Sequence, residues 1–397
     1  MSRKQWQVVV LLFLATSLNY VDRQTLSVLA PELRDRFHMS NTDYSRVVFA
    51  FLFAYMVMQS GSGRLLDRLG TRVGFSVCMG WWSAAAMLHA AVSSMSGLAV
   101  CRFLLGLGEA GNWPGGVKAV SEWFLPKQRA FAIGFFNSGS CVGAVLAPPV
   151  VAWIAIQWGW QSAFLLVGLP GFLWMAVWLA TYRTPARPAW DEGAGRRVAW
   201  LSLFRHREVW ALVLARMTAD PVWWFYVFWL PEYLKRERHF SLAAIGYFAW
   251  IPFFSAAFGS IVGGALSGGL IRRGVPVLRA RKLVMAASAF AMTAGIPAVF
   301  VTNSAVALAL ISLVTLAYSA WAANVLTLPA DLVPNDVVAS ISGISGTGAA
   351  LGGMVFTLVT GVVVDRFSYV PVFAAAGTLP LIALSSIVGG IRGKIEA

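Results

Sequence analysis

The sequence predicts an all-α integral membrane protein in which twelve transmembrane helices form two pseudo-symmetric six-helix bundles. Three observations predict this fold: the composition, the spacing of the apolar runs, and one long polar connection near the middle of the chain. Of the 397 residues, 58% are hydrophobic and 12% are charged, and the mean hydropathy is +0.69. An ordinary soluble domain is about 25% charged. The composition therefore excludes both a soluble domain and a disordered chain.

Twelve apolar runs are long enough to form membrane-spanning helices, since about 20 residues cross the roughly 30 Å of hydrocarbon. In chain order they cover residues 6–30, 43–66, 73–95, 97–120, 129–154, 161–182, 207–234, 242–271, 279–301, 303–330, 337–364 and 369–391. The runs are apolar all round rather than alternating, which excludes a transmembrane barrel. The first run follows two basic residues, as a signal peptide does, but no clear small-residue cleavage site ends it. We assign it as the first spanning helix.

The polar connection at residues 183–206 is rich in Pro and Gly and divides the runs into six and six. We expect an N-terminal bundle over 1–182, a cytoplasmic linker over 183–206 and a C-terminal bundle over 207–397. The pattern Gly63-x3-Asp67-Arg68 has a counterpart at Gly268-x3-Arg272, which indicates duplicated halves. Twelve helices in two repeats are typical of carriers that work by alternating access, with a binding site between the halves.

The net charge of +14 would by itself suggest a nucleic-acid partner, but its distribution does not. With the N-terminus in the cytoplasm, 21 of the 31 Lys and Arg residues lie in cytoplasmic loops, 7 in external loops and 3 inside apolar runs. This bias is the positive-inside pattern of membrane proteins. It predicts a lipid bilayer as partner, no nucleic acid, and both termini in the cytoplasm. The three cysteines lie in predicted helices without metal-ligand spacing, so we expect no metal site.

Several motifs resemble the major facilitator superfamily. GRLLDRLGTR at 63–72 is similar to the GxxxDRxGxR loop between helices 2 and 3, and Arg102-x3-Gly106-x-Gly108-Glu109 is similar to the RxxxGxG motif of helix 4. More narrowly, NYVDRQTLSV at 19–28, GEAGNWP at 108–114, SEWFLP at 121–126 and FNSGS at 136–140 resemble the anion:cation symporter family, nearest to its hexuronate and sugar-acid transporters. The resemblance spans the whole chain and implies a multi-pass protein of a bacterial inner membrane.

Six charged residues lie inside predicted helices: Asp22, Arg23, Arg102, Glu109, Arg216 and Asp220. Each costs about 2.5 to 3.5 kcal/mol at the bilayer centre, so they must face a wet cavity or one another. Helix rise places Asp22 and Arg102 at a similar depth and lets Arg23 reach toward Glu109. Such residues are functional by default. The alternative is two ion pairs that hold the first and fourth helices together.

Anion binding and proton uptake can be coupled through such a pair. An anion that takes the arginine leaves the carboxylate without its positive partner, which favours protonation, and protonation in turn frees the arginine. The resemblance implies that Asp22 and Glu109 bind protons and that Arg23 meets the substrate carboxylate. In the second half, Arg216 and Asp220 are four residues apart, which predicts either an intrahelical salt bridge or a second charged contact.

A sugar acid requires an anion clamp and several uncharged hydrogen-bonding groups, often with an aromatic ring beneath the sugar. The candidate substrate-binding residues are Arg23, Tyr20, Tyr55, Arg102, Asn112, Asn137, Ser140, Arg216, Trp224, Asn324, Ser345 and Thr347. Tyr20, Tyr55 and Ser140 match substrate contacts in the family, although the best-studied pattern has Gln in place of Ser140. Packing against lipid or a neighbouring helix is the alternative for the aromatic residues.

The candidate gating residues are Asp67, Arg68, Arg72 and Asp220. We expect the first three to form a cytoplasmic latch between helices of the two halves. The alternative for them is a solvated loop that satisfies the positive-inside rule.

These observations favour a monomeric proton-coupled symporter that imports a monoanionic sugar acid by alternating access. The substrate would be a hexuronate such as glucuronate or galacturonate, or a related aldonate, with protons as coupling ion and no bound cofactor. An anion exchanger or organophosphate carrier remains an alternative and would need an arginine from each half. A membrane receptor without transport is a second alternative. No His/Cys/Asp cluster or phosphate loop in the sequence suggests an enzyme.

Overall fold

The computed structural model describes residues 1–39, 41–185, 200–240, 248 and 250–393. Within these residues the regular structure is helical and no strand occurs. Most of the predicted linker, residues 186–199, lies outside the described residues. The all-α class that the composition predicts is confirmed.

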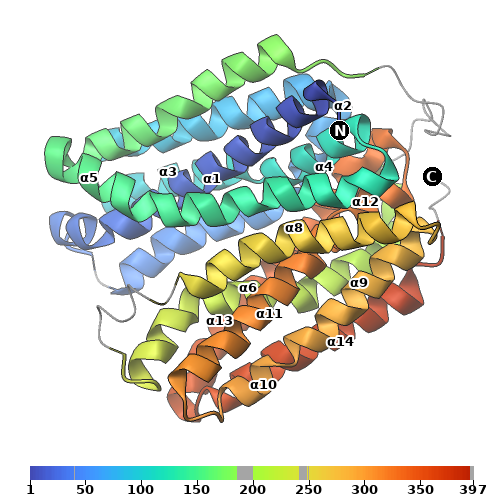
Figure 1. Ribbon diagram of the computed structural model, residues 1–397. Coiled ribbons are helices and arrows are strands. Elements are labelled where there is room, and N and C mark those ends of the chain that lie inside the picture. The colour runs from blue at the N-terminus through green and yellow to red at the C-terminus, as the bar shows by residue number, and fades with distance from the viewer. Residues whose placement is uncertain (40, 186–199, 241–247, 249, 394–397) are drawn as a thin grey trace. The chain divides into compact units, whose positions relative to one another are not determined.

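The helices follow the predicted runs in chain order (Figure 1). The first half of the chain forms α1 (Arg3–Arg36), α2 (Asn41–Leu88), η1 (His89–Ala91), α3 (Met95–Glu109), α4 (Asn112–Trp123) and α5 (Pro126–Thr181). The second half forms η2 (Trp200–Arg205), α6 (Arg207–Arg236), α8 (Ile251–Arg272), α9 (Val277–Met292), α10 (Gly295–Ala298), α11 (Ser304–Val325), α12 (Leu328–Leu332), η3 (Asn335–Val337), α13 (Val338–Arg366) and α14 (Val370–Gly390). The beginning of the run at 242–271 lies largely outside the described residues.

By length and apolarity alone, five helical segments of the described chain qualify as membrane spans. They are Pro126–Thr181, Ile251–Arg272, Ser304–Leu332, Asn335–Val364 and Val370–Gly390. The helices α1 and α6, which carry buried charges, are not among these five. The predicted run at 97–120 is divided into α3 and α4, and the run at 279–301 into α9 and α10, so that helix length also separates the twelve predicted spans from these five.

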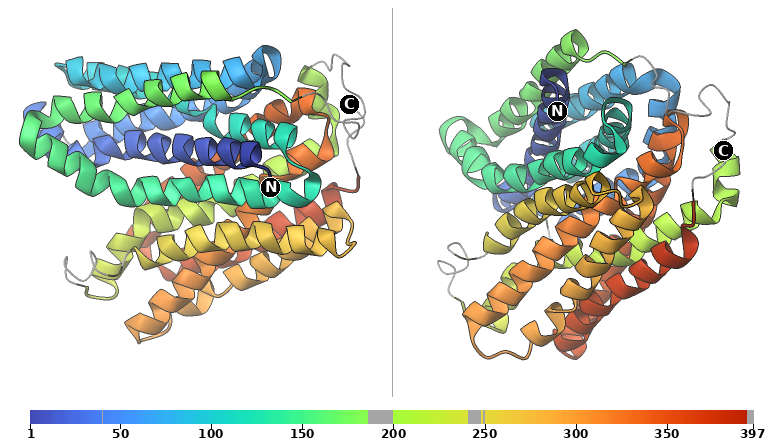
Figure 2. Two further views of the ribbon diagram at one scale, coloured as in Figure 1. Left: turned by 45° about the horizontal axis from the view of Figure 1, so that its top comes forward. Right: turned by 45° about the vertical axis from the view of Figure 1, so that its right-hand side comes forward.

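Two of the long helices each contain two predicted spans joined at a glycine. Gly70 in α2 has φ +76°, and Gly159 in α5 has φ +82°. This left-handed region is costly for residues that carry a Cβ. Figure 2 shows α5 turning back on itself, so that its two arms run in opposite directions. The predicted boundaries at 66–73 and 154–161 coincide with these glycines.

The chain divides into two compact units, which differ from the two sequence halves in two short segments. Unit 1 comprises Met1–Trp123, Gly139–Gly195 and Pro334–Gly343. Unit 2 comprises Phe124–Ser138, Arg196–Val333 and Ile344–Ala397. The first turns of α5 thus belong with unit 2, and η3 with the start of α13 belongs with unit 1. Each unit contains a short segment from the opposite half of the sequence.

Candidate functional site

In unit 1, an ion pair joins α1 to the end of α3. The Nε and Nη2 atoms of Arg23 donate to Oε2 of Glu109 at 3.0 and 2.9 Å, and Nη2 also donates to Oδ1 of Asn19 at 3.2 Å. The Glu109 side chain is fully buried, whereas that of Arg23 is 14% exposed. This is the contact that helix depth predicts for these two residues. A charge-assisted pair of this kind is strong when it is shielded from water.

Three aromatic rings surround the same guanidinium. The Cζ atom of Arg23 lies 4.9 Å from the ring centre of Tyr20, 5.2 Å from that of Phe51 and 4.9 Å from that of Tyr55. Cation–π contacts contribute about 0.5 to 2 kcal/mol each. They add to the hydrogen bonds to Glu109 and Asn19 in holding the cation in place. We call Arg23, Glu109 and these three rings the Arg23 cluster.

A glycine on α3 makes this cluster possible. A Cβ at Gly106 would collide with the backbone carbonyl oxygen of Phe51 and touch the side chain of Ala54. The absence of a side chain at Gly106 lets α3 lie directly against α2. Phe51 and Tyr55, which stack with ring centres 5.7 Å apart, are thereby brought beside Arg23.

The second pair expected in this region takes a different form. Both Nη atoms of Arg102 donate to the backbone carbonyl oxygen of Arg23 at 3.3 Å. Asp22 is buried and interacts electrostatically with Arg102 and Glu109, but no ion pair in the described part of the chain joins it to Arg102. The Oδ1 atom of Asp22 and the Oε1 atom of Glu109 are buried without a hydrogen-bond partner. A buried carboxyl group with an unpartnered oxygen is costly when ionised.

The other polar candidates of the first half of the sequence have separate neighbours. Nδ2 of Asn112 donates to Oγ1 of Thr16 at 3.2 Å, which ties α4 to α1. Ser140 is buried on α5 in unit 1. Asn137 belongs to unit 2, where its Nδ2 atom donates to Oγ of Ser260 at 2.9 Å.

In unit 2, Arg216 and Asp220 form the intrahelical pair that their spacing predicts. The Nε and Nη2 atoms of Arg216 donate to Oδ2 of Asp220 at 3.2 and 3.0 Å. Nη1 reaches Oγ of Ser345 on α13 at 3.5 Å. Arg216 and Asp220 are both buried. The pair is thus held largely by its own helix.

The remaining candidates of the second half are found on three helices of unit 2. Trp224 of α6 packs against Gly353 of α13, where a Cβ would collide with the indole ring. Asn324 is fully buried, and its Nδ2 atom donates to the carbonyl oxygens of Gly263 at 3.1 Å and Ala320 at 2.9 Å. Asn324 therefore fastens α11 to α8. Thr347 lies half-buried on α13.

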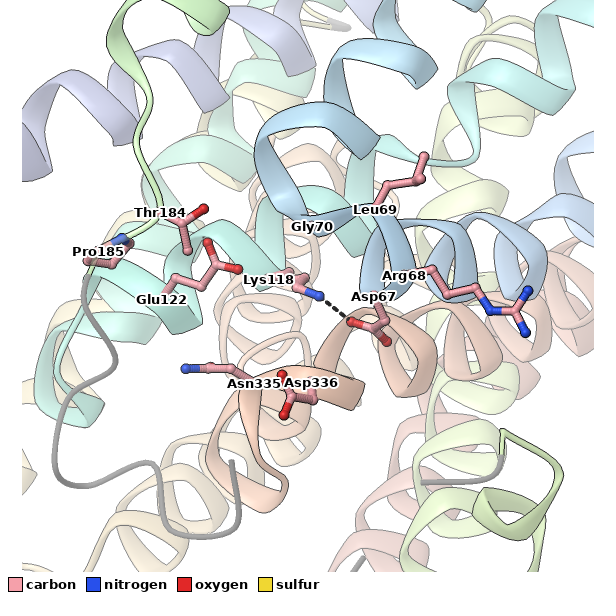
Figure 3. Close-up of a pocket in the computed structure, with 10 residues that line it drawn as sticks. All are labelled: Asp67, Arg68, Leu69, Gly70, Lys118, Glu122, Thr184, Pro185, Asn335 and Asp336. Carbon is pink, nitrogen blue, oxygen red and sulfur yellow. Dashed lines mark hydrogen bonds and ion pairs between the residues drawn. The ribbon is translucent and has the colours of Figure 1, made fainter. Parts of the chain in front are cut away.

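The expected latch around Asp67 has a different cationic partner. Nζ of Lys118 lies 2.6 Å from Oδ1 of Asp67, while Oδ2 accepts the backbone N–H of Ser340 at 2.7 Å. Arg68 points away from Asp67 (Figure 3), and Arg72 donates to the carbonyl oxygen of Leu179. Arg68 is the next residue on the helix and so projects about 100° away, and Arg72 follows the turn at the left-handed glycine. Asp67 nevertheless contacts the opposite sequence half, within unit 1.

Beside this latch is a polar cavity of about 350 Å³ (Figure 3). Glu122, on its wall, accepts hydrogen bonds from Oγ1 of Thr71 at 2.6 Å and from the hydroxyl of Tyr182. Burial raises the pKa of Glu122 above its ordinary value, although the hydroxyl donors and Lys118 oppose the shift. Burial likewise raises the pKa of Asp67, and the Lys118 ammonium opposes it.

Unit 2 contains a cluster of three charged residues that the sequence did not predict. Asp331 pairs through Oδ1 with Arg129 at 2.9 Å and through Oδ2 with Arg281 at 3.1 Å. Nη2 of Arg281 also donates to the carbonyl oxygen of Pro126 at 2.6 Å. In the sequence both arginines count only as positive-inside charges. The sequence repeat gives one indication of this cluster. The position that Asp67 occupies in the first half is taken by Arg272 in the second half. A carboxylate at the matching place in unit 2 must therefore come from another segment.

The chain is similar to known proteins over nearly its whole length. A model of the Major Facilitator Superfamily matches residues 12–357. The hexuronate transporter of Escherichia coli (strain K12) is 33% identical over 98% of this chain and 94% of its own length. The galacturonate transporter of Dickeya chrysanthemi is 34% identical over 66% of this chain and 80% of its own length. A probable L-galactonate transporter of Escherichia coli (strain K12) is 30% identical over 91% and 84%.

Solved structures share the fold at lower sequence identity. The proton:xylose symporter XylE bound to 6-bromo-6-deoxy-D-glucose has a TM-score of 0.78 and 14% identity, covering 98% of this chain and 96% of its own. The transporter FucP in the outward conformation has a TM-score of 0.75 and 17% identity, covering 98% and 100%. The similarity to these structures covers both units of the chain. Together with the family match, they establish that the chain belongs to the major facilitator superfamily and is a multi-pass membrane transporter, not an enzyme.

Proposed function

We propose that this protein is a symporter that imports a monoanionic sugar acid together with protons. The observation that carries the proposal is the Arg23 cluster, in which one partly exposed guanidinium is bound by a buried carboxylate and faced by three rings. Relatives named as transporters of hexuronate, galacturonate and L-galactonate support the substrate class. By alternating access, each half of the transport cycle would open this cluster to one side of the membrane.

The substrate carboxylate binds to Arg23 in this proposal. A guanidinium presents two parallel N–H groups that match a carboxylate, which favours a planar monoanion over a spherical ion. Tyr20 and Tyr55 offer an aromatic face to the sugar ring and hydroxyl groups to its polar edge. Arg102 holds the Arg23 carbonyl and so positions α1 at this level.

Proton coupling follows from competition for Arg23. When the substrate carboxylate occupies the guanidinium, Glu109 loses its positive partner in a buried environment, where the neutral acid costs less. Asp22, which is buried close to the same charges, is the second proton-binding group. Two protons with one monoanion carry net positive charge inward, so that the membrane potential assists uptake.

The remaining features of the proposal concern the setting. The positive-inside bias favours a bacterial inner membrane with both termini in the cytoplasm. We propose that the protein works as a monomer, with protons as the coupling ion and no bound cofactor.

Counterflow in proteoliposomes tests this function. Vesicles loaded with unlabelled glucuronate, galacturonate, galactonate or glucarate should take up the same labelled compound, with the monoanions favoured over the dianion glucarate. Failure of all four with success of a phosphate ester would replace the proposal with the organophosphate carrier. Saturable binding without any counterflow would indicate the receptor.

A further inference from the structure

A second cavity in unit 1 lies where α1 begins and α5 ends. It has a volume of about 250 Å³ and is built from three helices. Its lining is Lys4, Gln7, Val8 and Leu11 from α1, Trp123 from α4, and Thr181, Tyr182 and Arg183 at the end of α5. None of these residues belongs to the Arg23 cluster or to the Asp67 latch. The cavity is smaller than most clefts for drug-sized ligands and suits a compact group.

Among the described residues, the lining of this cavity carries positive charge without an acidic partner. Lys4 and Arg183 are both exposed, no acidic residue is in the lining, and neither cation takes part in an ion pair within the described ranges. Lys4 also lies in the first turn of α1, which contains no acidic residue. The N-terminal end of a helix carries partial positive charge and disfavours a cation. An anion in the cavity would relieve both effects.

The α1 wall of this cavity is partly apolar. Val8 and Leu11 form part of it, and another face of the same helix carries Trp6, Val10 and Leu14 at i, i+4 spacing, each about 40% exposed. The rings of Trp123 and Tyr182 pack edge to face, with their centres 6.2 Å apart. Trp and Tyr are enriched where hydrocarbon meets headgroups. A ligand that matches all of these groups has an anionic head and an apolar tail.

We propose that this cavity binds the phosphate headgroup of an anionic phospholipid from the leaflet that surrounds the start of α1. Lys4 and Arg183 contact the phosphate, and the acyl chains lie along Trp6, Val10 and Leu14. The lipid thereby ties the beginning of α1 to the end of α5. This role is independent of which solute the protein carries.

Lipid binding to the purified full-length chain in neutral detergent tests the proposal. Phosphatidylglycerol is titrated against phosphatidylcholine, with bound lipid counted by native mass spectrometry. We expect K4Q/R183Q to bind phosphatidylglycerol about 30-fold more weakly, from two lost charge contacts, and the charge-retaining K4R/R183K to bind within about threefold of wild type. The matched control is R273Q/R279Q, which removes two exposed cations of unit 2 and should leave the affinity unchanged.

Three outcomes would overturn the proposal. The first is an equal loss in K4Q/R183Q and in R273Q/R279Q, which would mean a general effect of charge. The second is equal affinity for phosphatidylcholine and phosphatidylglycerol in the wild type. The third is displacement of the lipid by millimolar inorganic phosphate or glycerol phosphate, which would make the cavity a site for free anions. Circular dichroism and gel filtration of each variant establish that loss of binding is not loss of the fold.

Discussion

Two ion pairs that lie inside predicted spans, one in each unit, use the same chemistry in different frameworks. Arg23 and Glu109 are 86 residues apart and stand on different helices, whereas Arg216 and Asp220 are four residues apart on α6. The backbone of one helix keeps an i, i+4 pair together, but a pair between helices separates when either partner finds a better one. The pair in unit 1 is therefore suited to exchange, and the pair in unit 2 is suited to stay closed.

The largest expected effect comes from removing the exchangeable cation. Arg23→Gln leaves Glu109 buried without its partner and removes the anion clamp, and loss of one member of a buried charge pair costs about 2 to 5 kcal/mol. We expect counterflow of the preferred sugar acid to fall by at least about 100-fold, as measured in proteoliposomes. Arg216→Gln, the matched change in unit 2, should lower it by less than about 10-fold. Equal losses in the two variants would erase the difference between the pairs.

Neutralising the carboxylate should separate binding from coupling. Glu109→Gln resembles the protonated acid, so substrate can still reach Arg23. We expect counterflow within about threefold of wild type and at least about a tenfold loss of accumulation driven by a pH gradient, with the same direction for Asp22→Asn. Wild-type accumulation in both variants would contradict the coupling role, and loss of counterflow as well would assign Glu109 to substrate binding.

The intrahelical pair should behave as a structural unit. Asp220→Asn leaves a buried guanidinium without its main acceptor, so it should lower stability more than the double change R216Q/D220N, which removes both charges. A double-mutant cycle on thermal unfolding in detergent should give a coupling of about 1 to 3 kcal/mol. Transport by the double variant should stay within about fivefold of wild type. A much larger transport loss would show that this pair also takes part in the cycle.

The sequence predicts the spans and some contacts between charged side chains, but it does not predict contacts to the backbone. The spans were predictable because long apolar runs have few alternatives, and glycines such as Gly70 mark where the chain reverses. The contact between Arg23 and Glu109 was predictable because helix rise fixes depth. The partner of Arg102 was not predictable, because Arg102 donates to a backbone carbonyl oxygen and every residue of the chain has one. No sequence pattern distinguishes the carbonyl that is used.

Contacts that depend on which helices are neighbours were harder still. Asp67 pairs with Lys118 rather than with Arg68 or Arg72, because α2 packs against α4 at that level. Nothing in the composition of the segments 124–138 and 334–343 indicates that each belongs with the opposite half of the sequence. The Asp331 cluster depends on the first of these exchanges, since Arg129 lies within it. Local pattern thus gives the helices and the intrahelical pair, and helix packing decides the ion pairs of Asp67 and Asp331.

The smallest effect is expected at Glu122, a third arrangement in which hydroxyl groups rather than an arginine hold the buried carboxyl group. Its pKa in the folded protein is raised from 4.5, first by burial. The group therefore contributes stability that is present below pH 4.5 and is lost as the pH rises through the folded pKa. The glutamine of Glu122→Gln cannot ionise, so the variant does not lose this stability as the pH rises. The difference between its melting temperature and that of wild type should therefore increase by about a few degrees from pH 4.5 to above the folded pKa.

Thermal unfolding in detergent from pH 4 to 8.5 measures this difference, and Glu122→Asp is the matched control because it keeps an ionisable group in the same place. The aspartate variant should retain a wild-type slope with pH even if its shorter side chain lowers stability throughout. A difference between Glu122→Gln and wild type that stays constant with pH would mean that the hydrogen bonds from Thr71 and Tyr182 offset the cost of burial. Hydroxyl donors would then stabilise a buried carboxylate as well as a guanidinium does. The replacement of Glu109 by a substrate carboxylate at Arg23 would in that case have to depend on the mobility of α1 and α3, rather than on the loss of a positive partner by Glu109.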